Sequence, residues 1–295
     1  MLGGRFLLMA LAVLLVAGTL AASASVDGRE AIDPSWSELP PSADEGPSIA
    51  EPGQRGEFVA QCPFSHRANN DPIVHPGHEG MSHSHDFFGN EQTDADSTIA
   101  SLREGTTTCH IGGDTAAYWV PTLYRDDELV TPDGSSAYYR GALGVDVTRL
   151  VPPPPGLVMI AGDSMATRAQ PTTVVGWACG GRGEVQVEPP DCRGRSELAL
   201  HVLFPDCWDG THLDADDHQD HVAYSEAGAC PDSHPVAMAQ LAFVVHYPIS
   251  GEPRELRLAS GDLATAHADF MNAWDQTILT AETRHCINRR VTCSV

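Results

Sequence analysis

Apolar and aromatic residues in this chain occur in short runs that are separated by glycine, proline and acidic residues. Eight such runs are rich in β-branched and aromatic side chains, a composition that is typical of strands. They span residues 57–62, 85–89, 117–124, 137–141, 156–162, 172–179, 197–204 and 241–247. Their length and spacing predict a mainly β fold, a single β-sandwich or jelly-roll-like domain with antiparallel strands and long loops.

The end of the chain shows a different period. From Thr265 onward, large side chains recur at spacings of three and four residues, which places them on one face of a helix. These residues are His267, Phe270, Met271, Trp274, Ile278 and Ala281. The pattern predicts a C-terminal helix whose apolar face, with His267 on it, packs against the domain.

The N-terminal residues 1–24 have the pattern of an export signal. One early cation, Arg5, precedes a long apolar run that ends in an A-x-A sequence at Ala24. Cleavage after Ala24 would release a secreted protein with no membrane attachment. An uncleaved anchor is the alternative, because the apolar run approaches the length of a membrane span.

Two further regions follow the predicted signal. Residues 25–57 combine acids and prolines with few large apolar residues, so they predict a disordered linker. Residues 58–295 are long enough for one large core, and we expect a single His-rich, disulfide-bonded domain there.

Charge excludes several classes of partner and cofactor. The formal net charge is −23, which disfavours nucleic acids and anionic membrane surfaces because both attract basic proteins. The sequence contains no lysine, which rules out a pyridoxal-phosphate (PLP) Schiff base and a P-loop lysine. We therefore expect no PLP and no nucleotide cofactor.

The chain has eight cysteines, an even number that predicts up to four disulfides in an exported protein. No C-x-x-C pair occurs, so a zinc ribbon or thioredoxin-type centre is poorly supported. Local closure is plausible for Cys286 with Cys293 and for Cys192 with Cys207, although spacing alone does not determine the pairing.

A first cluster of histidines lies in the segment "HPGHEGMSHSHDFF", residues 75–88. Side chains at i and i+2 point to the same face of a strand, so His83 and His85 predict two metal ligands held close together. Asp86 follows them as a candidate partner. For His75 and His78, a surface loop without function is an equally good interpretation, because glycine and proline surround them.

A second cluster lies in the segment "CWDGTHLDADDHQDHVAY", residues 207–224. The glycine and the terminal glutamate of an EF-hand are not at their required offsets, so that calcium motif is excluded. The acids could still bind calcium irregularly or orient imidazoles at a metal. The alternative is a solvated acidic loop.

A remote alternative comes from "GLVMIAGDSM" and "DGTH". These segments resemble the Gly-Asp-Ser and Asp-x-x-His blocks of SGNH hydrolases, so Ser164, Asp209 and His212 are a candidate esterase triad. The intervening blocks of that family are absent, and about 45 residues separate the two ends.

Several longer segments resemble a secreted family known as domain of unknown function nineteen-ninety-six, found in actinobacteria and fungi. They are "DPIVHPG", "SHSHDFFGN", "AAYWVPTLY", "YYRG", "CWDGTHLDADDHQDHVAY", "CPDSHPVAMAQLAFVVHYP" and "HADFMNAWD". The resemblance covers nearly all of residues 58–286. It implies an exported single domain, joined in some fungal relatives to carbohydrate-binding or cell-wall modules, and it supplies no catalytic residues.

These observations lead to one main hypothesis, an extracellular enzyme that acts on a polysaccharide or another cell-wall polymer, as a hydrolase or a lyase. Its candidate catalytic residues are His83, His85, His218, His221 and Asp209, and the same four histidines are candidate ligands for zinc, copper or calcium. Candidate supporting or substrate-binding residues are Asp86, Trp208, Asp214, His234, His267 and Asp269. A non-catalytic glycan- or metal-binding module is the alternative, and a structural wall protein is a third hypothesis.

Overall fold

The computed structural model describes Met1 and residues 55–293. Apart from Met1, the predicted signal peptide lies outside the described residues, as do residues 25–54 of the predicted linker. Within the described part of the chain, no helix is long and apolar enough to cross a membrane.

The domain is built on one nine-stranded sheet in which every neighbouring pair of strands is antiparallel. In order across the sheet, the strands are β7 (Val158–Gly162), β15 (His267–Met271), β3 (Ala117–Pro121), β2 (His85–Gly89), β1 (Glu57–Ala68), β6 (Gly134–Arg140), β13 (Gln240–Tyr247), β9 (Leu198–Leu203) and β8 (Val175–Cys179). All eight predicted runs contribute a strand to this sheet. The prediction of a mainly β domain is therefore confirmed.

The sheet curls until it is nearly closed into a barrel. Its two edge strands, β7 and β8, approach each other: a Cβ atom added to Gly162 would lie 3.1 Å from Cγ2 of Val175. Because side chains alternate across the pleat, each strand has an inner face toward the barrel core and an outer face. On β2, Phe88 packs in the main core while Phe87 packs in a separate outer cluster with Trp119 and Met271.

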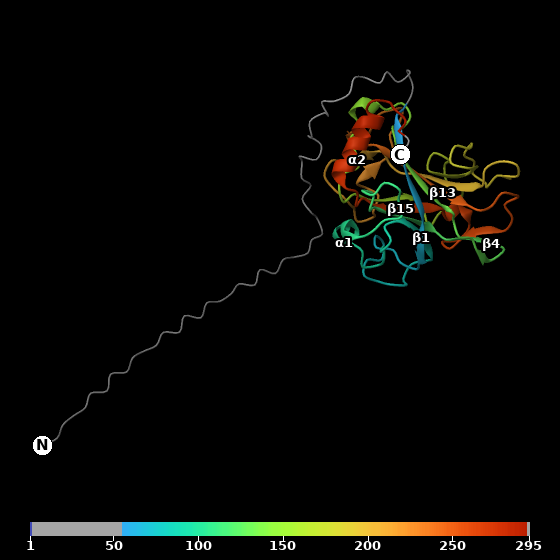
Figure 1. Ribbon diagram of the computed structural model, residues 1–295, viewed down its shortest axis with the longest axis horizontal. Helices are drawn as coiled ribbons and strands as arrows, with labels where there is room; N and C mark the ends of the chain where they lie inside the picture. Colours follow the sequence, from blue (N-terminus) through green and yellow to red (C-terminus); the bar gives the residue numbers. More distant parts are fainter. Residues whose placement is uncertain (2–54, 294–295) are drawn as a thin grey trace. The chain divides into compact units, whose positions relative to one another are not determined.

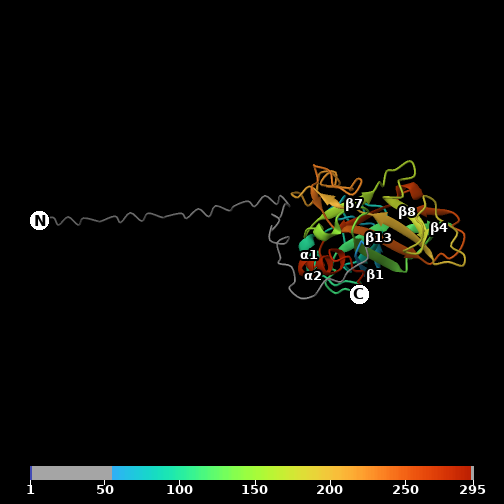
Figure 2. The same cartoon turned by 90° about the horizontal axis from the view of Figure 1, so that it is seen from above.

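Smaller elements lie around the barrel. One small sheet contains β10 (Cys207–Trp208), β11 (Val222–Ala223) and β12 (Val236–Ala237), and another contains β4 (Leu123–Arg125), β5 (Glu128–Leu129) and β14 (Leu256–Leu258). The helices are α1 (Ile99–Glu104) and α2 (Gln276–Glu282), with short helical turns at Val147–Arg149, Leu263–Thr265 and Thr283–Ile287. Figures 1 and 2 both show α1 and α2 at one end of the domain and β4 at the other.

The predicted C-terminal helix exists, but its start at Thr265 is wrong. Residues His267–Met271 form β15, and α2 begins only at Gln276, after Asp275 accepts hydrogen bonds from the backbone N–H groups of Thr277 and Ile278. Every residue of β15 is buried because both faces of this part of the sheet are covered. The strand therefore lacks the alternation that identifies a half-exposed strand, and its large side chains fit a helical spacing by coincidence.

Four disulfides connect all eight cysteines, as the even count predicted. They are Cys62–Cys109, Cys179–Cys192, Cys207–Cys230 and Cys286–Cys293. The predicted local closure of Cys286 with Cys293 is confirmed, whereas that of Cys192 with Cys207 is wrong. Cys192 lies in the loop between the paired strands β8 and β9, and this loop returns it to Cys179 at the end of β8. Cys207 lies on β10 in the separate small sheet, where its neighbour on the adjacent strand is Ala223.

Candidate metal centre

Three neighbouring strands, β15, β3 and β2, bring two distant histidines onto one outer face of the sheet. His85 pairs with Pro121 across β2 and β3, and Asp269 pairs with Trp119 across β15 and β3. Strands β15 and β3 are antiparallel, so two residues before Asp269 corresponds to two residues after Trp119, and His267 is level with Pro121 as well. Pro121 therefore lies on the strand between the two histidines, and their ring centroids are 5.9 Å apart.

A third imidazole completes the group. The ring centroid of His83, two residues before β2, lies 4.2 Å from that of His85 and 5.2 Å from that of His267. Each of these three residues offers a ligand atom, and these atoms all lie within 4.8 Å of one another. We refer to His83, His85 and His267 as the three-histidine group.

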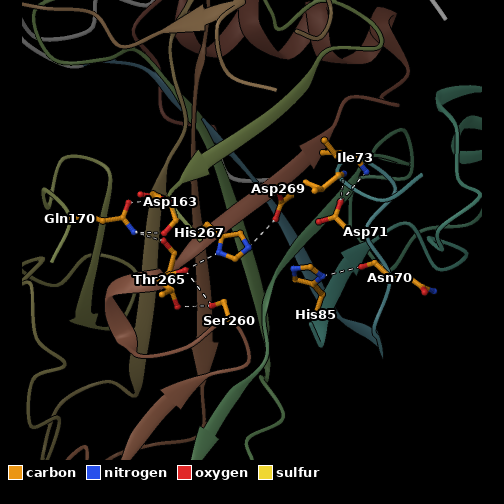
Figure 3. Close-up of polar contacts among 12 residues, drawn as sticks. Asn70, Asp71, Ile73, His85, Asp163, Gln170, Ser260, Thr265, His267 and Asp269 are labelled. Carbon is orange, nitrogen blue, oxygen red and sulfur yellow. Dashed lines mark hydrogen bonds and ion pairs between the residues drawn. The ribbon is translucent and has the colours of Figure 1, made fainter. Parts of the chain in front are cut away.

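Backbone carbonyl groups fix the tautomer of two members. Nδ1 of His85 lies 2.9 Å from the carbonyl oxygen of Asn70, and Nδ1 of His267 lies 2.8 Å from that of Thr265 (Figure 3). A carbonyl oxygen only accepts, so Nδ1 carries the proton in both neutral rings and Nε2 keeps a free lone pair. Among the described residues, buried Nε2 of His83 and of His85 has no hydrogen-bond partner.

Burial keeps these imidazoles neutral. Removal from water lowers the pKa of His83, with a smaller contribution from His75. Burial, followed by repulsion from His83 and His267, holds the pKa of His85 well below 6.5. The pKa of His267 falls to about 4, again mainly through burial. Neutral imidazoles with free lone pairs are the form that binds a metal ion.

A buried carboxylate accompanies the group. Asp269 is two residues after His267 on the same face of β15 and is only 1% exposed. Its Oδ2 atom lies 3.8 Å from Nε2 of His267 and makes no hydrogen bond within residues 55–293. Burial, followed by the neighbouring carboxylate of Asp71, raises the pKa of Asp269 well above its usual value. Figure 3 shows Asp71 and Asp269 on the side of His267 opposite Thr265.

The donor set fits a transition metal. Three imidazole nitrogens with a nearby carboxylate suit Zn²⁺ or Cu²⁺, whereas Ca²⁺ prefers six to eight oxygen ligands. The bonds from Nδ1 to backbone carbonyls are the partners that usually orient metal-bound histidines. A divalent cation between the three rings would bind the Nε2 lone pairs and would favour the ionised form of the nearby Asp269 carboxyl group.

Asp86 lies outside this group although it follows His85 directly. Its side chain points to the opposite, inner face, where it accepts a 2.6 Å hydrogen bond from Nε of Arg67 and a bond from Thr122. Asp86 therefore pairs with a cation of the chain itself and contacts none of the three imidazoles.

The second predicted cluster forms a separate structure, which we refer to as the acidic loop, residues 209–221. Its acids bond to the loop itself: Asp209 accepts from the backbone of Thr211 and His212 and lies 2.6 Å from Nδ1 of His212. Asp214 pairs in the same way with Nδ1 of His218, at 2.9 Å. These carboxylates thus shape the loop and orient its imidazoles.

Other predicted residues complete this region. His221 is buried, and its Nε2 lies 2.7 Å from the carbonyl oxygen of Val158. Trp208 donates its indole N–H to the carbonyl of His212, and Nε2 of His234 lies 2.9 Å from the carbonyl oxygen of Asp220. Each of these side chains thus lies within hydrogen-bond distance of a backbone carbonyl oxygen, either in the acidic loop or in the neighbouring strand β7.

The strand register shows that the two histidine regions are apart. His221 bonds to Val158 at one end of β7, whereas His267 pairs with Gly162 at its other end. Four residues of a strand span roughly 13 Å. The structure therefore does not bring His221, or His218 on the exposed loop beyond it, to the three-histidine group, and their predicted roles stay predictions.

The same strand separates the candidate esterase residues. The backbone of Val158 bonds to Leu213, next to His212, while Ser164 follows Gly162 at the far end of β7. Asp209 and His212 do form a pair, but Ser164 is roughly a strand length away, so the three are not assembled.

Sequence reasoning named His267 and Asp269 only as supporting residues and missed Asp71. The signal for the first two was the alternation of His267, Asp269 and Met271, which marks one face of a strand. Asp71 carried no such signal, because its position depends on a loop whose Ile73 and Val74 amides donate to its side chain.

Comparison with known proteins identifies one family. The profile of the family described as Domain of unknown function (DUF1996) matches residues 71–274, so the chain belongs to that family. The searches for similar curated proteins and for similar solved structures gave no match.

Proposed function

We propose that this is a secreted metal-dependent enzyme that acts on a polysaccharide or another cell-wall polymer. The observation that carries the proposal is the three-histidine group, in which the buried Nε2 atoms of His83 and His85 have no hydrogen-bond partner among the described residues, with the buried carboxyl group of Asp269 beside it. Three protein ligands leave the fourth position of a tetrahedral metal open, which is the arrangement of catalytic zinc sites.

Three features support secretion and a neutral polymer as the substrate. Four disulfides are typical of proteins in oxidising compartments. The N-terminal sequence has the pattern of an export signal. The net charge of −23 repels polyanions such as nucleic acids. A neutral polysaccharide meets these conditions, and it is the substrate class that we propose.

Metal analysis of the purified secreted protein tests the first half of the proposal. We expect about one zinc or copper ion per chain in the wild type and almost none in His85→Ala and His267→Ala. Equal, near-zero metal in all three proteins would exclude the metal site and favour a structural wall protein. Soluble products from a panel of wall polysaccharides, released only by the metal-loaded wild type, would establish the second half.

A non-catalytic metal-binding module is the second candidate, and one observation favours it. The Nε2 atoms of His83 and His85 are buried, and two cavities of about 410 and 610 Å³ lie elsewhere, beside His246 and beside Trp274. Binding of azide to the Co²⁺-substituted protein distinguishes the two candidates. If the metal has an open position, azide replaces the bound water and changes the visible spectrum. If the protein fills every position, azide leaves the spectrum unchanged.

A further inference from the structure

The loop before β2 carries three further side chains that can bind a metal ion and that the proposed function does not use. They are the imidazoles of His75 and His78 and the thioether of Met81, spaced three residues apart. His75 is partly exposed, His78 is exposed, and Met81 is 66% exposed. Within residues 55–293 neither imidazole forms an ion pair, in contrast to His212 and His218 of the acidic loop. These side chains are therefore accessible to an ion in solution.

Two consecutive turns fix the spacing of the three side chains. The N–H group of His78 donates to the carbonyl oxygen of His75 at 3.1 Å, and that of Met81 donates to the carbonyl oxygen of His78 at 3.3 Å. The third residue of each turn is a glycine with a φ of 74°, Gly77 and Gly80, as a type II turn requires. The first and last Cα atoms of such a turn are less than about 7 Å apart, so His78 has a potential ligand near it on either side.

Hydrogen bonds to the rest of the domain hold this loop in place. The N–H group of Gly77 donates to the carbonyl oxygen of Ala95 at 2.7 Å, and that of Gly80 donates to Oδ1 of Asn70 at 3.1 Å. The carbonyl oxygen of Asn70 also lies 2.9 Å from Nδ1 of His85, which links the loop to the three-histidine group. Because the backbone is already ordered, binding of an ion costs little additional conformational entropy.

The loop leads to His83, the most exposed member of the three-histidine group. His83 follows Met81 by two residues and is only partly buried, whereas His85 and His267 are 0% and 3% exposed. Burial lowers the pKa of His83, and the charge of His75 is the next cause. The imidazole of His75 therefore lies near that of His83. An ion held by the loop is close to the exposed edge of the group.

The thioether decides which ion suits this loop. Zinc sites in proteins are built from cysteine, histidine and carboxylate ligands, and methionine is not among them. Thioether sulfur is a soft ligand that favours Cu⁺. The net charge of −23 attracts cations in general, so it adds affinity without selecting the ion. Two imidazoles with one thioether therefore favour Cu⁺ over Zn²⁺.

We propose that His75, His78 and Met81 form a second, exposed metal site that binds Cu⁺ and delivers it to the three-histidine group. The exposed site depends on the loop alone, whereas the delivery rests on the proposed metal site. Delivery is an exchange of ligands in which copper remains Cu⁺. Bonds from Cu⁺ to the loop ligands break as bonds to Nε2 of His83 and of His85 form, and no electron is transferred.

Copper binding to the full secreted protein tests the exposed site. The probe is Cu⁺, supplied as its bicinchoninate complex without oxygen. We expect about two ions per chain in the wild type, with a sulfur ligand in the X-ray absorption spectrum, and about one ion without a sulfur ligand in Met81→Leu. The matched control is Met165→Leu, because Met165 is 81% exposed but follows β7, outside the loop. It should keep both ions and the sulfur ligand.

The rate at which the buried group fills tests the delivery. A bound ion on the loop raises the local concentration of Cu⁺ at His83, so Met81→Leu should fill the group at least about tenfold more slowly than the wild type. Its final content in that group should be unchanged. His85→Ala should show the reverse pattern, since it should lose the buried ion and keep the exposed ion with its sulfur ligand.

Each contrary result identifies what failed. A wild type without a sulfur ligand, or a second ion that persists in Met81→Leu, overturns the exposed site. Zn²⁺ that displaces the sulfur-bound Cu⁺ at a comparable concentration overturns the choice of copper. Equal filling rates in Met81→Leu and the wild type overturn only the delivery. If the sulfur-bound ion is present while His85→Ala loses no metal, the proposed three-histidine site is wrong and the exposed site stands.

Discussion

The three-histidine group and the acidic loop are both rich in histidine, but they satisfy their imidazoles in different ways. In the loop, His212 and His218 pair with Asp209 and Asp214, three or four residues away in the sequence. In the group, His85 and His267 bond through Nδ1 to backbone carbonyls, and the buried Nε2 atoms of His83 and His85 have no hydrogen-bond partner within residues 55–293. The carboxylates of the loop thus satisfy its imidazoles locally, whereas the unpartnered nitrogens of the group leave lone pairs for the metal ion that we propose.

The largest expected difference between the two regions is in metal affinity. His267→Ala should weaken Zn²⁺ binding by about 3–4 kcal/mol, or several hundredfold, because one ligand contributes roughly a quarter of the 10–16 kcal/mol of a four-ligand zinc site. His218→Ala should change the affinity less than twofold. Competition with a chromophoric chelator measures both, and an equal loss in the two variants would show that the acidic loop supplies a ligand.

The disulfide beside the acidic loop should affect stability and leave the metal site intact. Cys207 and Cys230 close a loop with a sequence separation of 23, so replacing both by serine should cost about 3.5 kcal/mol in the chain-entropy account. The Cys286–Cys293 pair, with a separation of 7, should cost only about 2.4 kcal/mol. Urea unfolding gives the free energies, and zinc content of the folded variants should stay at the wild-type value. Zinc loss in the Cys207–Cys230 variant would mean that the two regions are coupled.

The pH dependence of stability should also come from the group. In the metal-free protein the pKa of His267 is about 4, below the value of 6.5 expected for the unfolded chain. The unfolded state therefore binds the proton first, and the stability that is present above pH 6.5 is lost as the pH falls toward 4. At 1.36 kcal/mol per unit, this loss is about 3 kcal/mol.

Replacement of His267 by a residue that does not titrate checks this. His267→Gln should flatten the decrease in unfolding free energy between pH 7 and 4, measured with urea in the presence of a chelator. A slope that is the same in His267→Gln and in the wild type would assign the acid sensitivity to other groups.

The same comparison explains what the sequence could predict. The i, i+2 spacing of His83 and His85 was enough to place both in the candidate site, where their ring centroids are 4.2 Å apart. The prediction that both lie on one strand was wrong, because β2 begins only at His85. The third member of the group was recognised only as a supporting residue, because the position of His267 depends on the pairing of β15 with β3, nearly 150 residues earlier in the chain. The composition of the eight apolar runs identified the strands, but burial of both faces of β15 gave that strand a false helical period.

For the acidic loop, the sequence suggested a metal site that the structure does not assemble. Its histidines and acids have the composition of a metal site, and composition cannot distinguish carboxylates that cap a loop from carboxylates that orient metal ligands. The distinction depends on whether an acid bonds to a neighbouring amide, as Asp209 does with Thr211, or keeps an oxygen with no hydrogen-bond partner among the described residues, as Oδ2 of Asp269 does. Such local pairing becomes visible only with coordinates.

The smallest expected effect tests this distinction directly. Asp209→Ala removes the acceptor of two backbone N–H groups and of the His212 imidazole, so we expect a loss of about 1–2 kcal/mol in unfolding free energy and faster amide exchange at residues 211 and 212. Asp216→Ala, at an exposed position of the same loop, should change stability by less than about 0.5 kcal/mol. Hydrogen-exchange mass spectrometry and urea unfolding measure the pair. If Asp209→Ala left the loop unchanged but reduced the bound metal, the carboxylate would belong to a metal site and the contrast between the two regions would not hold.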